Sequence, residues 1–443
     1  MRPPVKTAYD LNFGEPMKVQ AGIRVAFIVS QFPLLSETFI LNQISGLIDR
    51  GCEVDIYAHK VSNEAVIHSD VVNYRLLSRT KCLSLPRSDS SMARIGKGTH
   101  FLIDGLSKHP AATLKALNPL KFGRTALSLT RLHQSHLFRN KQPYDIVHCQ
   151  FGPNGNLGMQ LKEAGALQGK LITHFRGYDS SAYVRFMGRD VYRNLFRKAD
   201  LILCVSASIK ARLLDLGCEE QKILIHHSGV DTDQFAVSHV PSRNGGKVRL
   251  VTIGRLVEKK GIKYAIEAVA EALKTHPELE YRIAGDGPLF NDLLRLIADL
   301  NVGERIQLLG RKRHDEVVQL LEDADILLAP SVTTENGDEE GIPNVLMEAL
   351  ARGLPVLSTY HGGIAELVQN GKSGFLVPEK DAKALAEKLR VLTDNRDLWP
   401  AMGKVGRSHV EEHFNINKLN DKLLAIYLRM CNLKSNPGAQ QPA

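Results

Sequence analysis

Two glutamates lie eight residues apart around a predicted helix start late in the chain. In the segment EEGIPNVLMEALARG, residues 339–353, Glu340 precedes Pro343 and Glu348 follows it. Proline suits the first position of a helix, where neighbouring backbone N–H groups stay available to phosphate oxygens. A carboxylate two turns further on can accept hydrogen bonds from two vicinal hydroxyls. The segment therefore predicts a diphosphate at the helix start, with Glu340 near a sugar and Glu348 near a ribose; two solvated glutamates are the alternative.

A second charged motif, GRLVEKKG at residues 254–261, follows the strand-like run VRLVTIG. It puts Arg255 and Lys260 between the tip of that strand and the start of the next helix. Cations are electrostatically disfavoured at a helix N-terminus, which favours a binding role over a solvated pair. A diphosphate leaving group gains charge as its glycosidic bond breaks, and two fixed cations would stabilise that charge. The pair therefore predicts chemistry that needs no metal ion and no other cofactor.

Strand-like and helix-like runs alternate in two series, and these elements must position the charged motifs. The strand-like runs are apolar throughout, as in parallel sheets that helices cover on both faces. The polar stretch SRNGGK, residues 242–247, separates the two series. In such sheets ligands bind at the carboxyl ends of the strands. We therefore predict an α/β protein with two doubly wound, Rossmann-like domains and a site in the cleft between them. The runs are IRVAFIVS, EVDIYAH, DIVHCQ, KLITHF, DLILCVS and KILIHHSGV in the first series, and VRLVTIG, LEYRIAG, RIQLLG, DILLAPS, LPVLST and GFLVP in the second.

The domain boundaries are predicted from the same pattern and from changes in composition. The sequence leaves open whether translation starts at Met1 or at Met17. The predicted parts are a disordered leader at 1–20, a first domain at 21–233, a linker at 234–247, a second domain at 248–408, a C-terminal helix at 409–430 and a disordered tail at 431–443.

Residues 75–142 form a basic insert in the first domain, with thirteen Lys or Arg and two acids, whereas the whole chain carries a net charge of +9. Apolar residues recur in the insert at roughly helical spacing, which is typical of basic amphipathic helices. Such a block indicates an anionic partner: a membrane surface, a polyprenyl diphosphate or a nucleic acid. It lacks the interleaved aromatics of nucleic-acid-binding surfaces, so we predict a lipid partner and no nucleic acid. A solvated helix face is the alternative.

Composition excludes several classes of protein. Hydrophobic residues make up 43% and charged residues 24% of the chain, as in soluble globular proteins. The N-terminus has no apolar signal-peptide region, and no window is apolar enough to span a membrane. The six cysteines show neither a CxxC pair nor metal-like spacing, so neither disulfides nor a zinc site is expected. We therefore predict a cytoplasmic protein.

The motifs GRLVEKKG, AGDGP, LLG, LLAPS and EGIPNVLMEALARGLPVLST together resemble the retaining GT-B glycosyltransferases of the paired-glutamate type, or glycosyltransferase group one. In the first half, FPLLSETFILNQ (32–43) and THFRGYD (173–179) resemble the exopolysaccharide branch, which includes colanic acid and amylovoran transferases. The resemblance implies that the C-terminal helix crosses back to the first domain. It also implies front-face transfer with retention, in which the leaving phosphate helps to take the acceptor proton.

The resemblance assigns a donor site to the second domain. Glu340 would contact the transferred sugar, Glu348 the ribose, and Arg255 with Lys260 the diphosphate. His174, at a strand end, would lie beside the donor sugar; a hydrogen-bonded core histidine is the alternative. The remaining donor-binding residues are backbone donors of the helix start (Gly341, Ile342, Pro343, Asn344), glycines that admit the nucleotide (Gly254, Gly285, Gly287) and Arg311 near the base.

The acceptor side is predicted in the first domain. It comprises Ser36, Glu37 and Thr38 after the first strand, Arg176 as a ligand of acceptor phosphate, and Asp179 as an organiser of its loop. Ser36 and Glu37 could instead cap a helix. Many relatives have a glycine-rich loop where this chain has SQFPLLSET.

The predicted activity is transfer of a sugar from a UDP- or GDP-sugar to a lipid-linked oligosaccharide at the inner face of the membrane. A GT-B epimerase or phosphorylase, or a non-catalytic nucleotide-sugar binding protein, would share the architecture.

Overall fold

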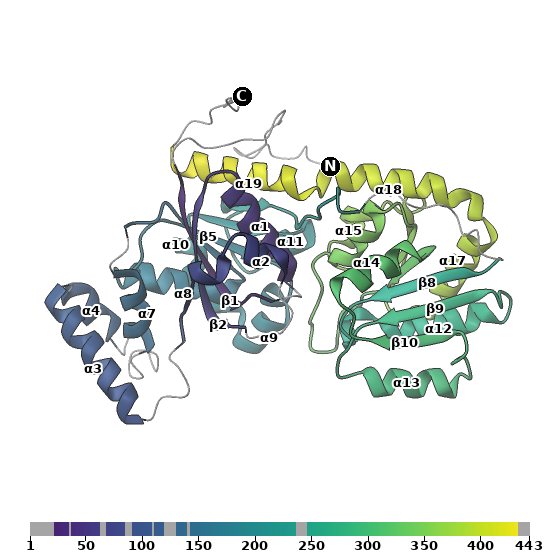
Figure 1. Ribbon diagram of the computed structural model, residues 1–443, viewed down its shortest axis with the longest axis horizontal. Coiled ribbons are helices and arrows are strands. Elements are labelled where there is room, and N and C mark those ends of the chain that lie inside the picture. The colour runs from purple at the N-terminus through teal and green to yellow at the C-terminus, as the bar shows by residue number, and fades with distance from the viewer. Residues whose placement is uncertain are drawn as a thin grey trace.

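A computed structural model describes residues 22–34, 37–62, 68–84, 91–108, 110–118, 130–139, 142–235 and 246–432. The predicted leader, most of the predicted linker, most of the tail and Ser36 lie outside these residues. Figure 1 shows two domains side by side, joined along one edge by the C-terminal helices.

Each domain is built on one parallel sheet. The order of the first sheet is β3-β2-β1-β4-β5-β6-β7 and that of the second is β10-β9-β8-β11-β12-β13, and every pairing is parallel. In each sheet the order reverses beside the first strand of the domain, β1 or β8, and such a reversal opens a crevice at the carboxyl ends of the strands. The predicted fold class is therefore confirmed. The strands are β1 Arg24–Phe32, β2 Glu53–Val61, β3 Thr80–Cys82, β4 Ile146–Gln150, β5 Lys170–Phe175, β6 Leu201–Cys204, β7 Ile223–Ile225, β8 Val248–Ile253, β9 Leu279–Ala284, β10 Ile306–Gly310, β11 Ile326–Ala329, β12 Val356–Thr359 and β13 Gly374–Val377.

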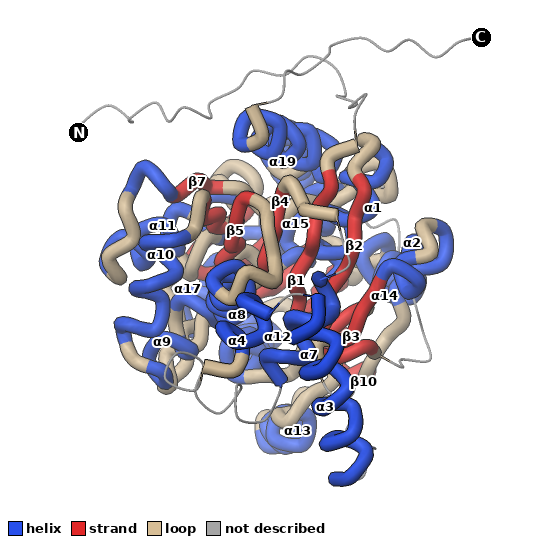
Figure 2. The backbone as a smooth tube through the Cα atoms, turned by 90° about the vertical axis from the view of Figure 1, so that its left-hand side faces the viewer, coloured by secondary structure: helices blue, strands red, loops and turns tan. Residues whose placement is uncertain are grey.

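Buried clusters lie on both faces of each sheet, and Figure 2 shows helices around the strands of the first, which explains why the strand-like runs are apolar without alternation. Those of the first domain are α1 Thr38–Asp49, α2 Ser69–Asn73, α3 Ser91–Lys108, α4 Pro110–Ala116, α7 Thr130–Arg139, α8 Gly152–Glu163, α9 Ala182–Met187, α10 Arg193–Lys198 and α11 Ala207–Asp215. Those that follow are α12 Ile262–Leu273, α13 Phe290–Asp299, α14 His314–Glu322, α15 Asn344–Ala351, α16 Ile364–Leu367, α17 Ala382–Asp394, α18 Trp399–His413 and α19 Ile416–Met430.

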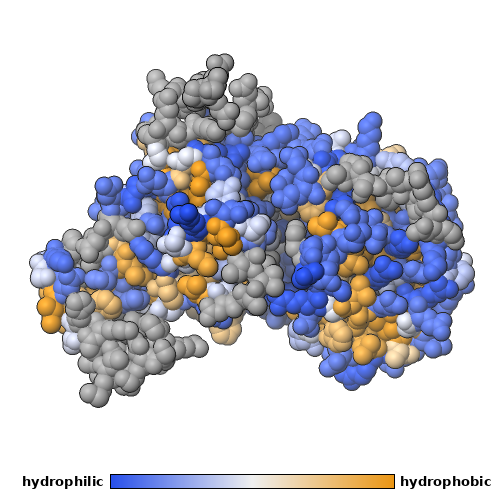
Figure 3. Space-filling view, in the orientation of Figure 1, coloured by the Kyte–Doolittle hydropathy of each residue, from blue (hydrophilic) through white to orange (hydrophobic). Residues whose placement is uncertain are grey.

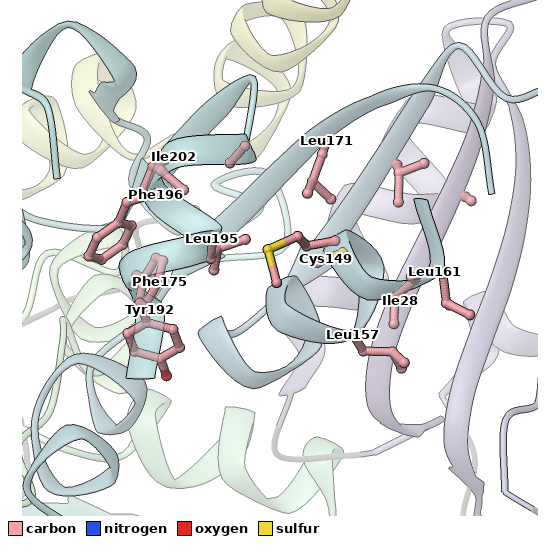
Figure 4. Packing of buried hydrophobic residues seen from close by; sticks show 14 of the residues in the cluster. Ile28, Cys149, Leu157, Leu161, Leu171, Phe175, Tyr192, Leu195, Phe196 and Ile202 are labelled. Carbon is pink, nitrogen blue, oxygen red and sulfur yellow. The ribbon is translucent and has the colours of Figure 1, made fainter. Parts of the chain in front are cut away.

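Packing in the first domain is close around α8. Leu157 and Leu161 of this helix belong to one buried cluster with Ile28 of β1 and Leu171 of β5 (Figure 4). Burying apolar surface of this kind is the main favourable contribution to folding. The cluster packs α8 against β1 and β5, two of the strands that lead to the site.

The predicted helix at 409–430 is two helices in the structure. Helix α18 ends at His413, and α19 begins at Ile416 after Asn415, whose side chain accepts hydrogen bonds from the backbone N–H groups of Asn417 and Lys418. Asparagine is a favoured residue at a helix N-cap because it satisfies these otherwise unpaired donors. Helix α19 continues from α18 and lies over the first domain, as Figure 1 shows in yellow.

Helix α19 completes the core of the first domain. Leu423, Leu424 and Tyr427 pack in one buried cluster with residues of β1 and α1. The guanidinium of Arg50, just after α1, lies 2.7 Å from the carboxylate of Asp421, and both residues are buried. Helix α19 is therefore a structural part of the first domain.

Candidate active site

A cavity of about 820 Å³ lies between the domains and is lined by residues that follow β1, β5 and β8 and by the start of α15. Figure 3 shows the surface indented between the two domains. Motifs that are more than 300 residues apart in the sequence meet here. Of the residues predicted from sequence, the lining includes Glu37, Thr38, Arg176, Asp179, Gly254, Arg255, Lys260, Glu340, Gly341, Ile342, Pro343, Asn344 and Glu348.

Two lysines hold the carboxylate of Glu340. Nζ of Lys260 lies 3.3 Å from its Oε1, and Nζ of Lys259 lies 3.7 Å from the same atom. Burial by itself would raise the pKa of Glu340, but the charges of Lys260 and Lys259 outweigh burial and hold that pKa below its ordinary value. Glu340 is therefore ionised at neutral pH, so it can accept hydrogen bonds from hydroxyl groups but has no proton to donate. Lys259 was not predicted, although the KK doublet was a visible signal.

A buried histidine fixes the backbone of Glu340. The Glu340 N–H donates to Nε2 of His361 over 3.0 Å, and Nδ1 of His361 lies 2.6 Å from a carboxylate oxygen of Glu379. The Nε2 atom accepts, so the ring proton is on Nδ1 and points to Glu379. Sequence reasoning missed both residues; the one available signal was that His361 lies two residues after the buried strand β12.

Helix α15 starts at Asn344, one residue after Pro343, and both residues line the cavity. Its N-terminal backbone N–H groups and its dipole make this end of the helix attractive to an anion. Glu348 follows one turn inside the helix and lines the same cavity. Burial raises the pKa of Glu348 to about 7, while the charge of Arg352 lowers it. Glu340 thus precedes the start of α15 and Glu348 lies one turn inside it, and both carboxylates border one cavity.

The loop after β8 carries Gly254 and Arg255 to the cavity. A Cβ on Gly285 would lie 1.8 Å from the carbonyl oxygen of Gly254, so glycine at this position lets the loop after β9 pack against the loop after β8. Gly285, Gly287 and Arg311 are not among the residues that line the cavity. These glycines therefore shape the loop that carries Arg255. That they or Arg311 also contact the nucleotide stays a prediction.

Arg176 reaches the cavity from the loop after β5 and is held along its whole guanidinium. It donates to the side-chain oxygens of Gln150 and Ser228, both over 2.9 Å, and to Gln43 over 3.2 Å. Its cationic group also lies 4.1 Å from the ring centre of Phe39. Burial lowers the pKa of Arg176 to about 9, which leaves it charged at neutral pH. Gln43, Gln150 and Ser228 come from separate elements, and sequence reasoning did not predict them.

Asp179 organises the loop that carries Arg176. Its carboxylate accepts hydrogen bonds from the backbone N–H groups of Gly152 at 2.9 Å and of Arg176 and Gly177 at 3.0 Å. Three backbone donors on one carboxylate fix a loop firmly because each would otherwise be buried without a partner. This geometry agrees with the loop-organising role predicted for Asp179.

The expected place of His174 beside the donor sugar needs correction. His174 is at the end of β5, but its side chain is fully buried and is not among those that line the cavity. Its Nε2 lies 3.1 Å from the carbonyl oxygen of His226, and its Nδ1 lies 3.3 Å from a guanidinium nitrogen of Arg176. His174 therefore contacts the Arg176 guanidinium from the buried side, away from the cavity. It still lies within the sheet, whereas Arg176, two residues later, has passed the end of the strand.

The two halves of the cavity touch through their loops. A Cβ on Gly341 would lie 2.5 Å from the carbonyl oxygen of Arg176, so a larger residue would push the domains apart. Beside this contact Arg212 of α11 forms an ion pair with Glu339. The loop of Glu340 and the loop of Arg176 are thus in direct contact, which joins the second-domain and first-domain sides of the site.

Comparison with known proteins identifies the family. A family model described as Glycosyl transferases group 1 matches residues 234–409, and one described as Glycosyltransferase Family 4 matches residues 36–234. A Salmonella typhimurium protein named as a colanic acid biosynthesis glycosyltransferase, WcaL, is 38% identical over 409 residues, which are 91% of this chain and 99% of the relative. The amylovoran biosynthesis glycosyltransferase AmsK of Erwinia amylovora is 35% identical over 417 residues, or 92% of this chain and all of the relative.

Solved structures agree on the fold. A glycosyltransferase from Rickettsia africae superimposes with a TM-score of 0.66 at 18% identity, covering 93% of this chain and 99% of that protein. HepE of Anabaena, in complex with UDP and glucose, superimposes with a TM-score of 0.65 at 16% identity, covering 91% and 99%. The predicted GT-B architecture is therefore confirmed. Because relatives at 35–38% identity span nearly the whole chain, it belongs to the group 1 glycosyltransferases, together with the proteins named for colanic acid and amylovoran biosynthesis.

Proposed function

We propose that this glycosyltransferase retains the configuration of the transferred sugar and needs neither a metal ion nor another cofactor. It takes the sugar from a UDP- or GDP-linked donor and transfers it to an oligosaccharide on a polyprenyl diphosphate, in exopolysaccharide or capsule biosynthesis. The names of the relatives that span the chain support the pathway, and the cavity supports the chemistry.

The observation that carries the proposal is the ionised Glu340 held by Lys260 and Lys259 beside the start of α15. A donor diphosphate at this helix start would meet backbone N–H groups, Arg255 and Lys260. As the glycosidic bond breaks, the leaving phosphate gains negative charge, which these fixed positive groups stabilise without reorganising. The protein thus supplies the charge that a divalent ion supplies elsewhere.

Retention requires that the acceptor hydroxyl approach the face from which the phosphate leaves. Glu340 is already paired with two lysines, which makes it a poor nucleophile for a covalent sugar–enzyme intermediate. The acceptor oxygen therefore bonds directly to the anomeric carbon as the phosphate departs, and the phosphate helps to take the acceptor proton. The contribution of the protein is then positioning and charge stabilisation.

A donor screen tests this function. The full-length protein is incubated with UDP-glucose, UDP-galactose or GDP-mannose and membrane-extracted lipid-linked oligosaccharides, and release of nucleoside diphosphate is followed. We expect release from one donor, an α-linkage in the product by NMR when the donor is α-linked, and no loss with EDTA. An inverted linkage would contradict retention, and EDTA inhibition would contradict metal independence. Conversion of the donor without an acceptor would instead favour an epimerase.

We also propose that the basic insert holds the protein, in the cytoplasm, at the inner face of the membrane. Across the described residues, no helix combines the length and the apolar character that crossing a bilayer requires. Helices α3 and α4 project from the first domain at the left of Figure 1, and they expose Ile103 (69%), Leu114 (63%) and Leu106 (40%). Lys108 and Lys115 are exposed on the same helices. Apolar side chains rimmed by cations suit an anionic lipid surface.

Replacing both Ile103 and Leu114 with serine is expected to weaken binding to phosphatidylglycerol-containing vesicles about tenfold or more, since two large apolar side chains no longer enter the bilayer. Binding is measured by vesicle sedimentation at low and high salt, and salt should weaken the binding of the unaltered protein. Val72→Ser, an equally exposed apolar position on α2, is the matched control. Binding that ignores salt, or that Val72→Ser reduces equally, would contradict this role.

A further inference from the structure

Glu37 has a carboxylate in the wall of the cavity, and one of its two oxygens lacks a hydrogen-bond partner among the described residues. It directly precedes α1 and lines the cavity from the first domain. Its Oε2 atom is shielded from solvent and has no hydrogen-bond partner among the residues that the structure describes. A buried polar atom without a partner destabilises the folded protein, so such an atom in a native site calls for a functional explanation.

Helix capping does not explain the carboxylate. Glu37 occupies the N-cap position of α1, yet its side chain accepts no hydrogen bond from the helix. Its backbone N–H is already paired with the carbonyl oxygen of Leu34 at 2.9 Å. The capping role that the sequence left open is therefore not the one the side chain performs.

The surroundings of Glu37 indicate the kind of ligand that fits. Arg176 of the same domain and Arg255 of the other both act on it electrostatically, but burial prevails and raises the pKa of Glu37 to about 7. The Arg176 guanidinium already donates its hydrogen bonds to Gln150, Ser228 and Gln43, not to Glu37. With two cations already near, a further cationic ligand is disfavoured, whereas a neutral O–H donor would satisfy Oε2 at little electrostatic cost.

We propose that Glu37 binds a hydroxyl group of the acceptor sugar, and so selects and orients the acceptor opposite the donor site. This inference rests on the proposed function. It places acceptor recognition on the first domain, across the cavity from Glu340 and Glu348. The acceptor recognised by Glu37, after β1, is therefore a sugar with a free hydroxyl group.

The test uses the full-length protein, the preferred nucleotide sugar, and octyl glucoside, octyl galactoside and octyl mannoside as acceptor probes. Two rates are measured: transfer to the octyl glycoside and hydrolysis of the donor in its absence. We expect Glu37→Gln to lower the ratio of transfer to hydrolysis by about 10- to 100-fold, chiefly by raising KM for the glycoside, since the charged acceptor of the hydrogen bond is replaced by a neutral amide. Glu53→Gln, at the exposed first residue of β2, is the matched control.

The pH profile separates recognition from a structural role. Ionised Glu37 accepts a hydroxyl hydrogen bond better than the neutral acid, so kcat/KM for the glycoside should rise as pH increases through about 7. The Glu37→Gln variant should lack this rise. The other titratable and charged groups lining the cavity are His68, Arg176, Tyr178, Asp179, Asp231, Arg255, Lys259, Lys260, Asp338, Glu339, Glu340 and Glu348. Donor is kept saturating at each pH, so that titration of Glu348 does not enter through donor binding.

A melting-temperature measurement completes the test. Removing an unpartnered buried carboxylate should leave the Glu37→Gln protein at least as stable as the unaltered protein. An unchanged ratio of transfer to hydrolysis, or a pH rise that survives the substitution, would overturn the inference. The inference would also be overturned if the unaltered protein hydrolysed the donor but transferred the sugar to none of the three glycosides. Absence of any donor cleavage would instead refute the proposed function itself.

Discussion

Lys260→Ala is expected to lower turnover by about a hundredfold or more, the usual cost of losing one donor that stabilises transition-state charge. Glu340→Ala should have an effect of similar size, because Lys260 and Glu340 lie 3.3 Å apart and form one unit of the site. Without Glu340, Lys260 and Lys259 lose the carboxylate that holds them, and the sugar loses an ionised acceptor for its hydroxyls. The measurement is kcat for nucleoside diphosphate release at saturating donor and acceptor.

Lys263→Ala is the matched control for this prediction. Lys263 is exposed in the first turn of α12, and its Nζ lies 3.8 Å from a carboxylate oxygen of Glu267. It should behave like the unaltered protein. Full activity of either Lys260→Ala or Glu340→Ala would show that the catalytic centre lies elsewhere. Because the two side chains are coupled, the double variant should lose much less than the product of the two single losses.

Arg50→Ala is expected to destabilise the protein by about 3–5 kcal/mol, the typical cost of removing one partner from a buried ion pair. Arg50 pairs with Asp421 at 2.7 Å and also donates to the backbone oxygens of Gly46 and Asn417, each at 2.9 Å. These bonds tie α19 to α1. Urea unfolding followed by circular dichroism measures the loss. Tryptophan fluorescence adds a local probe, because the single tryptophan, Trp399, lies in the second domain.

Arg193→Ala provides the comparison for the stability experiment. Arg193 pairs with Asp190 at 2.6 Å, but both side chains are largely exposed, and such pairs contribute little to stability. Its unfolding curve should match that of the unaltered protein. Equal shifts for Arg50→Ala and Arg193→Ala would mean that burial of the Arg50–Asp421 pair does not decide its contribution.

The sequence predicted the second-domain side of the site better than the first-domain side, for a physical reason. Glu340, Asn344 and Glu348 are close in sequence and belong to one loop and one helix, so local rules place them together. Gln43, Gln150 and Ser228, which hold Arg176, come from three separate elements and meet only through tertiary packing. No local pattern announces such a meeting.

Side-chain direction was the other limit. His174 ends an apolar run, so a strand was rightly predicted, but whether its ring enters the cavity depends on where the sheet layer stops. The run KILIHHSGV predicted a strand to Val230, whereas β7 spans only Ile223–Ile225. The residues beyond it leave the sheet, and Ser228 reaches Arg176. Strand β3, with the sequence TKC, is too short and too polar for periodicity to reveal it.

Helix α19 has a consequence for the order in which the chain matures. Domains generally fold as units as they leave the ribosome, with the N-terminal one first. Here Leu423, Leu424 and Tyr427, which complete the core around β1, lie in α19 and are synthesised after every strand of the second domain. The domain that is made first therefore cannot bury this apolar face until α19 has also been made. The second domain is synthesised after the first, but its core can be buried before that of the first domain.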